Sequence, residues 1–305
     1  MKQLFKNISP FNNELEMSNG LFIIKKMLAF WVCYIAGLFL AEGIVILLHF
    51  VLGKNIFEGE MFDSLTITLI TYYGYIVVAI VALLYWKIIE RKPLSKMGVT
   101  IQFGNYFIGI IIAVLVLILC VSLIIWTGNM EYYGFLEDSN MLILALFVGG
   151  FIIQGATEEI LCRGIVLHSL KEKTSLTIAI SVSTFLFIVP HFSSLFSGAI
   201  IYGVIGIINL VFISVILSLL TIHFNSIWVA CGLHSCWNLI VYSVLGLNLS
   251  GTEDTVVAIV NMDSIGNNVW NGGQYGIEAS IITTFVLAIT ALLIFYITRK
   301  GVSSK

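Results

Sequence analysis

The chain alternates long apolar stretches with short polar connections, and this pattern sets the prediction of its structure. A helix needs about 20 mainly apolar residues to cross the hydrocarbon core of a bilayer. Eight stretches have this length, and we predict that each forms a membrane-spanning helix: residues 27–52, 65–86, 104–126, 141–169, 175–195, 198–220, 226–248 and 276–298. The predicted fold class is therefore all-α, a polytopic helical membrane protein with about eight transmembrane helices in one bundle.

The predicted helices divide the chain into three regions. Residues 1–140 hold three helices, residues 141–248 hold the next four, and residues 249–305 hold an outer loop and the last helix. We expect the loop 249–275 to be polar, with a short surface segment at 255–260. The first apolar stretch begins too late and is too long for a cleaved signal peptide.

Composition supports the membrane prediction and excludes several classes of protein. The chain has 305 residues, of which 59% are hydrophobic and 10% are charged. Soluble domains carry about 25% charged residues, so a water-soluble enzyme and a disordered protein fit poorly. A net charge of −2 provides no broad basic surface for nucleic acid.

The cysteines give no sign of a disulfide framework or a structural zinc site. Their number is odd, they form no CxxC pair, and all lie in apolar stretches: Cys33, Cys120, Cys162, Cys231 and Cys236. We expect them to be buried and to act as small hydrophobic residues.

The loop charges predict the orientation in the membrane. With eight spans, 13 of the 15 Lys and Arg residues lie on one side of the membrane. The loops on the opposite side are acidic, and Lys54 is their only basic residue. Because positively charged loops stay in the cytoplasm, both termini should be cytoplasmic.

The remaining ionisable residues lie within or near the spans. An ionisable group inside a bilayer costs at least about 2.5–3.5 kcal/mol, so it needs a partner, a cavity or a function. Glu42 could be a structural partner or line a cavity. Four others lie near span ends, where we expect interfacial water to solvate them: His49, His168, His223 and Glu278.

The fourth predicted span contains two adjacent carboxylates that cannot have the same role. Glu158 and Glu159 point about 100° apart on a helix, and Arg163 lies four residues after Glu159, on the same face. Glu159 and Arg163 therefore suit an ion pair, which could be purely structural. Glu158 has no local counter-charge, which suits a general base.

Two later spans contribute histidines. Pro190 should bend the fifth span, and His191 follows at the bend, where there is room for water or substrate. His234 and Asn238 lie four residues apart in the seventh span and could hold a metal, position a water or stabilise an oxyanion. Taken alone, His191 or the pair of His234 and Asn238 could also simply form hydrogen bonds between helices. Gly232 and Ser235 should let another helix approach closely.

Together, the polar residues of the fourth, fifth and seventh predicted spans suit the activation of water and the stabilisation of a tetrahedral oxyanion. The chain has no HExxH motif and no P-loop. A proton-coupled carrier remains compatible, because Glu and His chains also relay protons.

The order Glu158-Glu159-x-x-x-Arg163, Phe187-x-x-x-His191, His234-x-x-x-Asn238 resembles the CAAX protease and bacteriocin-processing family of intramembrane proteases, also called Abi or CPBP. The resemblance covers about residues 141–245, so it marks 141–248 as a catalytic core. It implies that Glu158 is the catalytic glutamate and that His191 helps it to activate the attacking water. It further implies that His234 and Asn238 stabilise the oxyanion or bind a metal, and that Glu159 and Arg163 support the site.

The family is usually described as metalloproteases, so the resemblance implies a divalent metal such as zinc as a candidate cofactor. The candidate ligands are Glu158, His191, His234 and Asn238. Cys162 stands where relatives often carry an aromatic residue, which alters the lining of the pocket and removes no proposed catalytic group.

The resemblance predicts an intramembrane endopeptidase that acts on a membrane-associated peptide or protein in the lipid bilayer. Many Ile, Lys and Asn residues suggest a low-GC bacterium, hence the bacterial plasma membrane. Bacterial relatives are associated with peptide maturation, bacteriocin immunity and envelope regulation. The main alternative is therefore a non-catalytic immunity or envelope-regulation scaffold of the same family.

Overall fold

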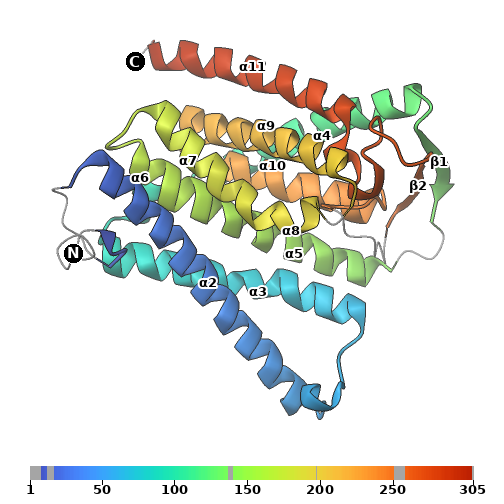
Figure 1. Ribbon diagram of the computed structural model, residues 1–305, viewed down its shortest axis with the longest axis horizontal. Coiled ribbons are helices and arrows are strands. Elements are labelled where there is room, and N and C mark those ends of the chain that lie inside the picture. Colours follow the sequence, from blue (N-terminus) through green and yellow to red (C-terminus); the bar gives the residue numbers. More distant parts are fainter. Residues whose placement is uncertain (1–7, 12–16, 137–139, 197, 251–257, 304–305) are drawn as a thin grey trace.

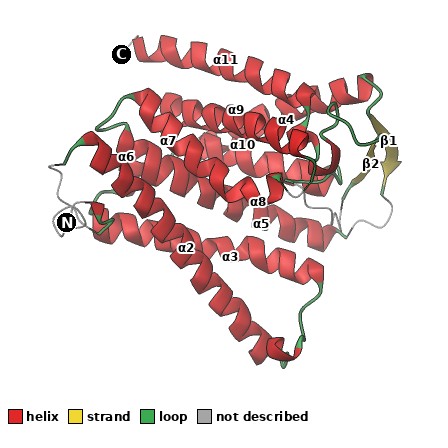
Figure 2. Ribbon diagram, in the orientation of Figure 1, coloured by secondary structure: helices red, strands yellow, loops and turns green. Residues whose placement is uncertain are grey.

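The computed structural model describes residues 8–11, 17–136, 140–196, 198–250 and 258–303. Within these residues the chain is mostly helical, and the long helices form one bundle (Figures 1 and 2). Seven helices are long and apolar enough to cross a membrane. They are α2 (Asn19–Val51), α3 with its π-helical end (Ser64–Glu90), α4 (Gly104–Trp126), α5 to α6 (Met141–Leu170), α7 to α8 (Leu176–Leu195), α9 (Ile200–Phe224) and α11 (Ile281–Ser303).

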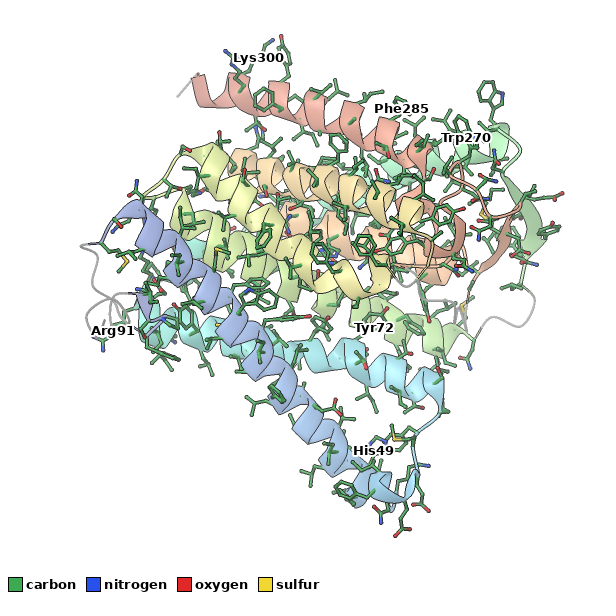
Figure 3. All side chains as sticks on the ribbon, viewed as in Figure 1. His49, Tyr72, Arg91, Trp270, Phe285 and Lys300 are labelled. Carbon is green, nitrogen blue, oxygen red and sulfur yellow. The ribbon has the colours of Figure 1, made fainter. Side chains whose placement is uncertain are left out.

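The chain is therefore a multi-pass helical membrane protein, as the sequence predicts. The outer faces of its helices carry large apolar side chains, among them Phe39, Leu292 and Phe285, which is labelled on α11 in Figure 3. Such a surface suits lipid chains and would be unusually apolar for a protein in water.

The predicted span 226–248 forms a shorter helix at the centre of the bundle. Helix α10 (Trp228–Leu239) continues into a π-helical segment, η6 (Ile240–Val244), and packs against α4, α5 and α9. Ten of the twelve residues of α10 are buried. Protein therefore surrounds this helix, which explains how it can carry His234, Ser235 and Asn238.

Polar side chains fix the starts of several helices. Ser18, Asp63, Asn140 and Ser175 each accept a hydrogen bond from a backbone N–H in the first turn of the helix that follows. These N-caps satisfy donors that have no partner within the helix.

Helix α2 begins eight residues before the predicted start at residue 27. Lys25 and Lys26 suggest a loop in the sequence, yet both are buried in the first turns of α2. The Lys26 ammonium lies 2.7 Å from the carboxylate of Glu90, at the end of α3. This buried ion pair allows the helix to extend through Lys26.

A small sheet joins two connections at one end of the bundle (Figure 1). Strand β1 (Met130–Phe135) pairs antiparallel with β2 (Val260–Ser264), with an irregularity between Tyr132 and Gly134. The sequence predicts only a polar loop at 249–275. Of its expected surface segment, residues 255–257 lie outside the described part, and residue 260 begins β2.

Short helical turns occupy other connections. The 3₁₀ turns η1 (Ile56–Glu58) and η3 (Leu94–Met97) follow α2 and α3, and the turns η7 (Gly273–Tyr275) and η8 (Ile277–Ala279) precede α11. Residues 276–280, which the sequence assigns to the last span, therefore lie before that helix.

All five cysteines are buried and free, as expected. They pack in a core that also contains Phe147, Phe151 and Tyr242, whose rings contact one another.

Glycines allow α10 to approach two neighbouring helices closely. A Cβ on Gly232 would meet the backbone oxygen of Tyr106 in α4, and a Cβ on Gly109 would meet the backbone oxygen of Val229 in α10. On the other side, Gly155 of α5 lies against Ser235. The close approach expected at Gly232 and Ser235 is therefore confirmed.

We expect Gly109→Ala to destabilise the protein by about 1–3 kcal/mol, because the methyl group forces α4 and α10 apart. The matched control is Gly43→Ala in α2, where a Cβ meets no atom within 4 Å. That control should leave stability unchanged or raise it by about 0.5–1 kcal/mol. The free energy of unfolding of each variant is measured by titration with a denaturing detergent. Equal values for Gly109→Ala and Gly43→Ala would contradict the prediction.

Candidate functional site

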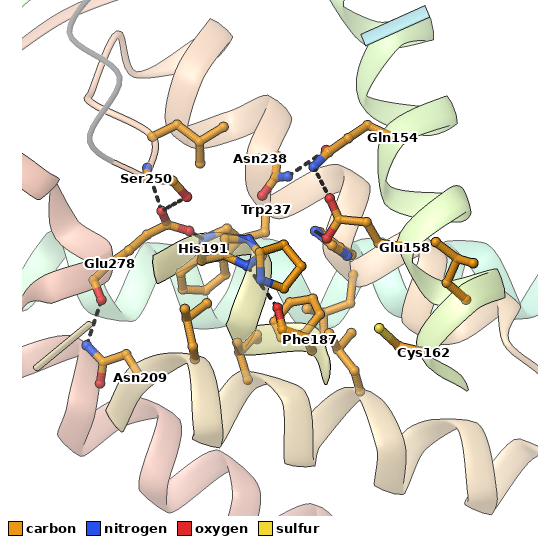
Figure 4. Close-up of a pocket in the computed structure, with 18 of the residues that line it drawn as sticks. Gln154, Glu158, Cys162, Phe187, His191, Asn209, Trp237, Asn238, Ser250 and Glu278 are labelled. Carbon is orange, nitrogen blue, oxygen red and sulfur yellow. Dashed lines mark hydrogen bonds and ion pairs between the residues drawn. The ribbon is translucent and has the colours of Figure 1, made fainter. Parts of the chain in front are cut away.

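One cavity inside the bundle collects the side chains that the sequence singles out (Figure 4). Its volume is about 210 Å³, and residues from α2, α3, α5, α7, α9, α10 and α11 line it. Four predicted site residues are among them, from three helices: Glu158, His191, His234 and Asn238.

Glu158 lies near the end of α5 and faces the cavity. One of its carboxylate oxygens, Oε1, accepts a hydrogen bond of 2.7 Å from Nε2 of Gln154, one turn earlier. The other oxygen, Oε2, lies 3.9 Å from Nε2 of His234. The side chain is 14% exposed, so water can reach this second oxygen. The direct distance is too long for a hydrogen bond, and a bridging water suits such a gap.

Glu159 turns away from the cavity into the protein and forms the expected ion pair. Nη1 of Arg163 donates to its Oε1 at 3.0 Å, and both side chains are fully buried. The Arg163 guanidinium also donates to the backbone oxygen and the hydroxyl of Ser214, and it stacks 4.7 Å from the ring centre of Phe187. Arg163 lies in the π-helical segment η4 (Ile160–Leu167), which follows the two carboxylates directly.

His234 connects the ion pair to the cavity. Its Nδ1 lies 2.9 Å from Oε1 of Glu159, the same oxygen that Arg163 contacts. A carboxylate beside an arginine is an acceptor, so Nδ1 carries the proton of this hydrogen bond. The free nitrogen of the ring is then Nε2, which faces Glu158.

Asn238 completes the polar side of α10. Its amide nitrogen donates to Oε1 of Gln154 at 2.9 Å. Gln154 therefore joins Asn238 to Glu158, and α10 to α5. An amide nitrogen has two hydrogens, so one N–H of Asn238 is left for another partner.

His191 lies at a bend in the fifth span. Helix α7 ends at Ile188, the turn η5 (Val189–His191) contains Pro190, and α8 (Phe192–Leu195) follows. The bend expected from Pro190 is therefore present. Nδ1 of His191 lies 2.9 Å from the backbone oxygen of Phe187, which can only accept. Nδ1 therefore carries the proton, and Nε2 is the free acceptor.

The cavity contains further polar residues that the sequence does not single out as site residues, among them Gln154 and Glu278. Gln154 lies four residues before Glu158, a spacing that could have indicated it. Glu278 was expected in interfacial water, but it lines the cavity and accepts a hydrogen bond from the indole of Trp237. No local spacing indicates this contact, because the two residues are far apart in the chain.

Three other ionisable residues lie away from the cavity. The interfacial placement of His49 and His168 is wrong, since both are buried: His49 lies against Phe62, and His168 contacts the backbone oxygen of Arg163. The connection between α2 and α3 covers His49, and packing within the bundle covers His168. Glu42, which the sequence leaves open, is exposed on the outside of α2.

The candidate metal ligands are spread around the cavity. The hydrogen bonds to Glu159 and Gln154 leave Nε2 of His234 and the amide oxygen of Asn238 free. Among the described residues, no group of three or more His, Cys, Asp or Glu side chains is placed to hold a metal ion. Glu158, His191 and His234 are therefore not gathered around one metal position in this arrangement.

The region that holds these residues matches a known family. Residues 140–240 match the family model described as type II CAAX prenyl endopeptidase Rce1-like. The match covers about a third of the chain and includes Gln154, Glu158, His191, His234 and Asn238. Comparison with curated proteins and with solved structures gives no match.

Proposed function

We propose that the chain is an intramembrane endopeptidase of the CAAX protease type, because residues 140–240 match the model of that family. It hydrolyses a peptide bond of a membrane-associated peptide or protein. One observation carries the proposal: Glu158, His191, His234 and Asn238 come from three separate helices and line one cavity within the bundle. A carboxylate and two histidines around a cavity of about 210 Å³ suit hydrolysis.

In the proposed reaction, Glu158 and His191 hold the attacking water. Oε2 of Glu158 takes its proton, because Oε1 is already engaged by Gln154. Nε2 of His191 accepts the second hydrogen of the water, because Nδ1 donates to Phe187. The water oxygen then adds to the peptide carbonyl, and the proton on Glu158 passes to the leaving amine.

The oxygen of the tetrahedral intermediate needs donors. The second N–H of Asn238 is one candidate, since Gln154 uses only the first. His234 is the other, when a proton on Nε2 makes it a donor on both sides of the ring. In other acyl-transfer enzymes the loss of one such donor costs about 2.7–4 kcal/mol of transition-state stabilisation.

The proposed reaction uses no metal ion, because Glu158, His191 and His234 are not gathered around one metal position. Cleavage should therefore survive a strong zinc chelator. The second measurement is the metal content of the purified protein, which should contain no stoichiometric zinc. Loss of cleavage with the chelator, and its return with added zinc, would favour the metalloprotease alternative instead.

The bundle also suggests how the protein lies in the membrane. The start of α2 and the end of α11 lie at the same end of the bundle (Figure 1). Lys92 and Glu172, from two of the lysine-rich connections, form an ion pair at 2.6 Å. We propose that this end faces the cytoplasm of a bacterial cell and that the protein lies in its plasma membrane.

The test is a search for cleaved membrane peptides in cells. New peptide N-termini are compared between cells expressing the wild-type protein and cells expressing Glu158→Gln at equal membrane levels. Products found only with the wild type support the endopeptidase. Identical peptide sets, with any immunity phenotype retained by the variant, would instead support the scaffold of the same family.

We expect Gln154→Leu to reduce cleavage about tenfold, since its amide holds one oxygen of Glu158 and also Asn238. The turnover number should fall more than the apparent affinity for substrate, because the change misplaces the base without removing it. Kinetics on a cleaved peptide, with Glu42→Gln as the control, measure this. Wild-type kinetics for Gln154→Leu would exclude a positioning role.

A further inference from the structure

Glu278 is a second carboxylate in the cavity that the proposed reaction does not use. It lies in η8, outside the region that matches the family. In the view of Figure 4, His191 lies between Glu278 on one side and Glu158 on the other. All three side chains line the same cavity, so a substrate that fills it can contact both carboxylates.

The carboxylate of Glu278 has only neutral donors around it. The indole N–H of Trp237 donates to Oε1 at 3.1 Å, and the backbone N–H and hydroxyl of Ser250 donate to Oε2 at 2.8 and 2.9 Å. No ion pair with a Lys, Arg or His is formed by Glu278 within the described part of the chain. Three neutral hydrogen bonds leave its charge without a counter-ion.

The same contacts leave room for one more donor. A carboxylate has about four acceptor positions, and three are filled. Each neutral donor contributes less than a cationic one, which forms a shorter and stronger hydrogen bond. The open position on Glu278 therefore suits an ammonium or guanidinium group.

Neighbouring residues hold Glu278 firmly in place. The amide of Asn209, in α9, donates to the backbone oxygens of Glu278 and Ser280 at 2.8 and 3.0 Å. Trp237, which contacts the carboxylate, precedes Asn238 in α10. A cation bound at Glu278 would therefore have a fixed position relative to the proposed catalytic residues.

We propose that Glu278 selects substrates by binding a lysine or arginine side chain near the scissile bond. This inference rests on the proposed endopeptidase function and adds the class of substrate. The apolar lining, with Leu161, Leu186 and Leu217, takes the surrounding apolar residues. The preferred substrate is thus an apolar membrane segment interrupted by one basic residue.

Binding to the full-length Glu158→Gln protein in lipid nanodiscs tests the inference without requiring cleavage. The probes are fluorescent Leu/Ala peptides of about 20 residues, each with one Lys at a different position, and a matched set with Gln. At one or more positions the Lys peptide should bind about 10- to 100-fold more tightly. In the Glu158→Gln protein, the second substitution Glu278→Gln should remove the preference for Lys. The second substitution Glu278→Lys should instead favour a third peptide set, with Glu in place of Lys.

The control is Glu131→Gln, which removes an exposed carboxylate on β1 and should keep the preference for Lys. Equal binding of every Lys and Gln pair, or a Lys preference that survives Glu278→Gln, would overturn the inference. The wild-type protein is then tested for cleavage of the same peptides. Cleavage without a Lys preference contradicts only the role of Glu278, whereas selective binding without cleavage contradicts only the endopeptidase.

Discussion

Replacing Glu158 with glutamine should reduce peptide cleavage by about 100- to 10,000-fold while the protein still inserts into the membrane. Glutamine keeps the size of the side chain and an oxygen that Gln154 can contact. It cannot take a proton from water at neutral pH. The change therefore removes the proposed base and keeps the surrounding packing.

The matched control for this variant is Glu42→Gln. It changes the same residue type on the outer face of α2, away from the cavity. Cleavage is measured at equal protein levels, and circular dichroism checks that both variants keep their helices. If Glu158→Gln cleaved at the wild-type rate, Glu158 would not be the base.

Replacing Arg163 with methionine should cost about 3–5 kcal/mol of stability. The variant leaves the carboxylate of Glu159 fully buried beside His234, without the guanidinium that neutralises it. It also removes two hydrogen bonds to Ser214 and the contact with the ring of Phe187. We expect this to be the largest stability loss among the variants considered.

Two further variants separate charge from packing. Lys92→Met breaks an exposed ion pair with Glu172 and should cost at most about 1 kcal/mol. Combining Arg163→Met with Glu159→Gln should restore part of the lost stability, because the unpaired charge disappears. Free energies of unfolding in a detergent titration measure all three. A loss below about 1 kcal/mol for Arg163→Met would mean that the pair does not stabilise the bundle.

The apolar pattern predicts the helices better than it predicts their ends. It places α4 at residues 104–126, as observed, because polar residues border that stretch on both sides. It starts α2 late, because the ion pair that accommodates Lys26 depends on Glu90 in another helix. The strands β1 and β2 escape prediction because each is short and gains its hydrogen bonds only from the other.

Spacing along one helix predicts part of the candidate site. It identifies the pair of Glu159 and Arg163 and the shared face of His234 and Asn238. It does not reveal that His234 contacts Glu159, or that Glu278 contacts Trp237, because each contact joins separate helical segments. Whether these residues catalyse hydrolysis stays a prediction for the variants above.

The ion pair between Lys26 and Glu90 bears on how the protein is made. Lys26 leaves the ribosome long before Glu90 does. Its buried ammonium therefore gains this partner only after the end of α3 has been synthesised. The first helix on its own would leave this ammonium without its carboxylate partner. We therefore infer that α2 and α3 enter the bilayer together as a helical hairpin, and that the later helices then pack against this hairpin.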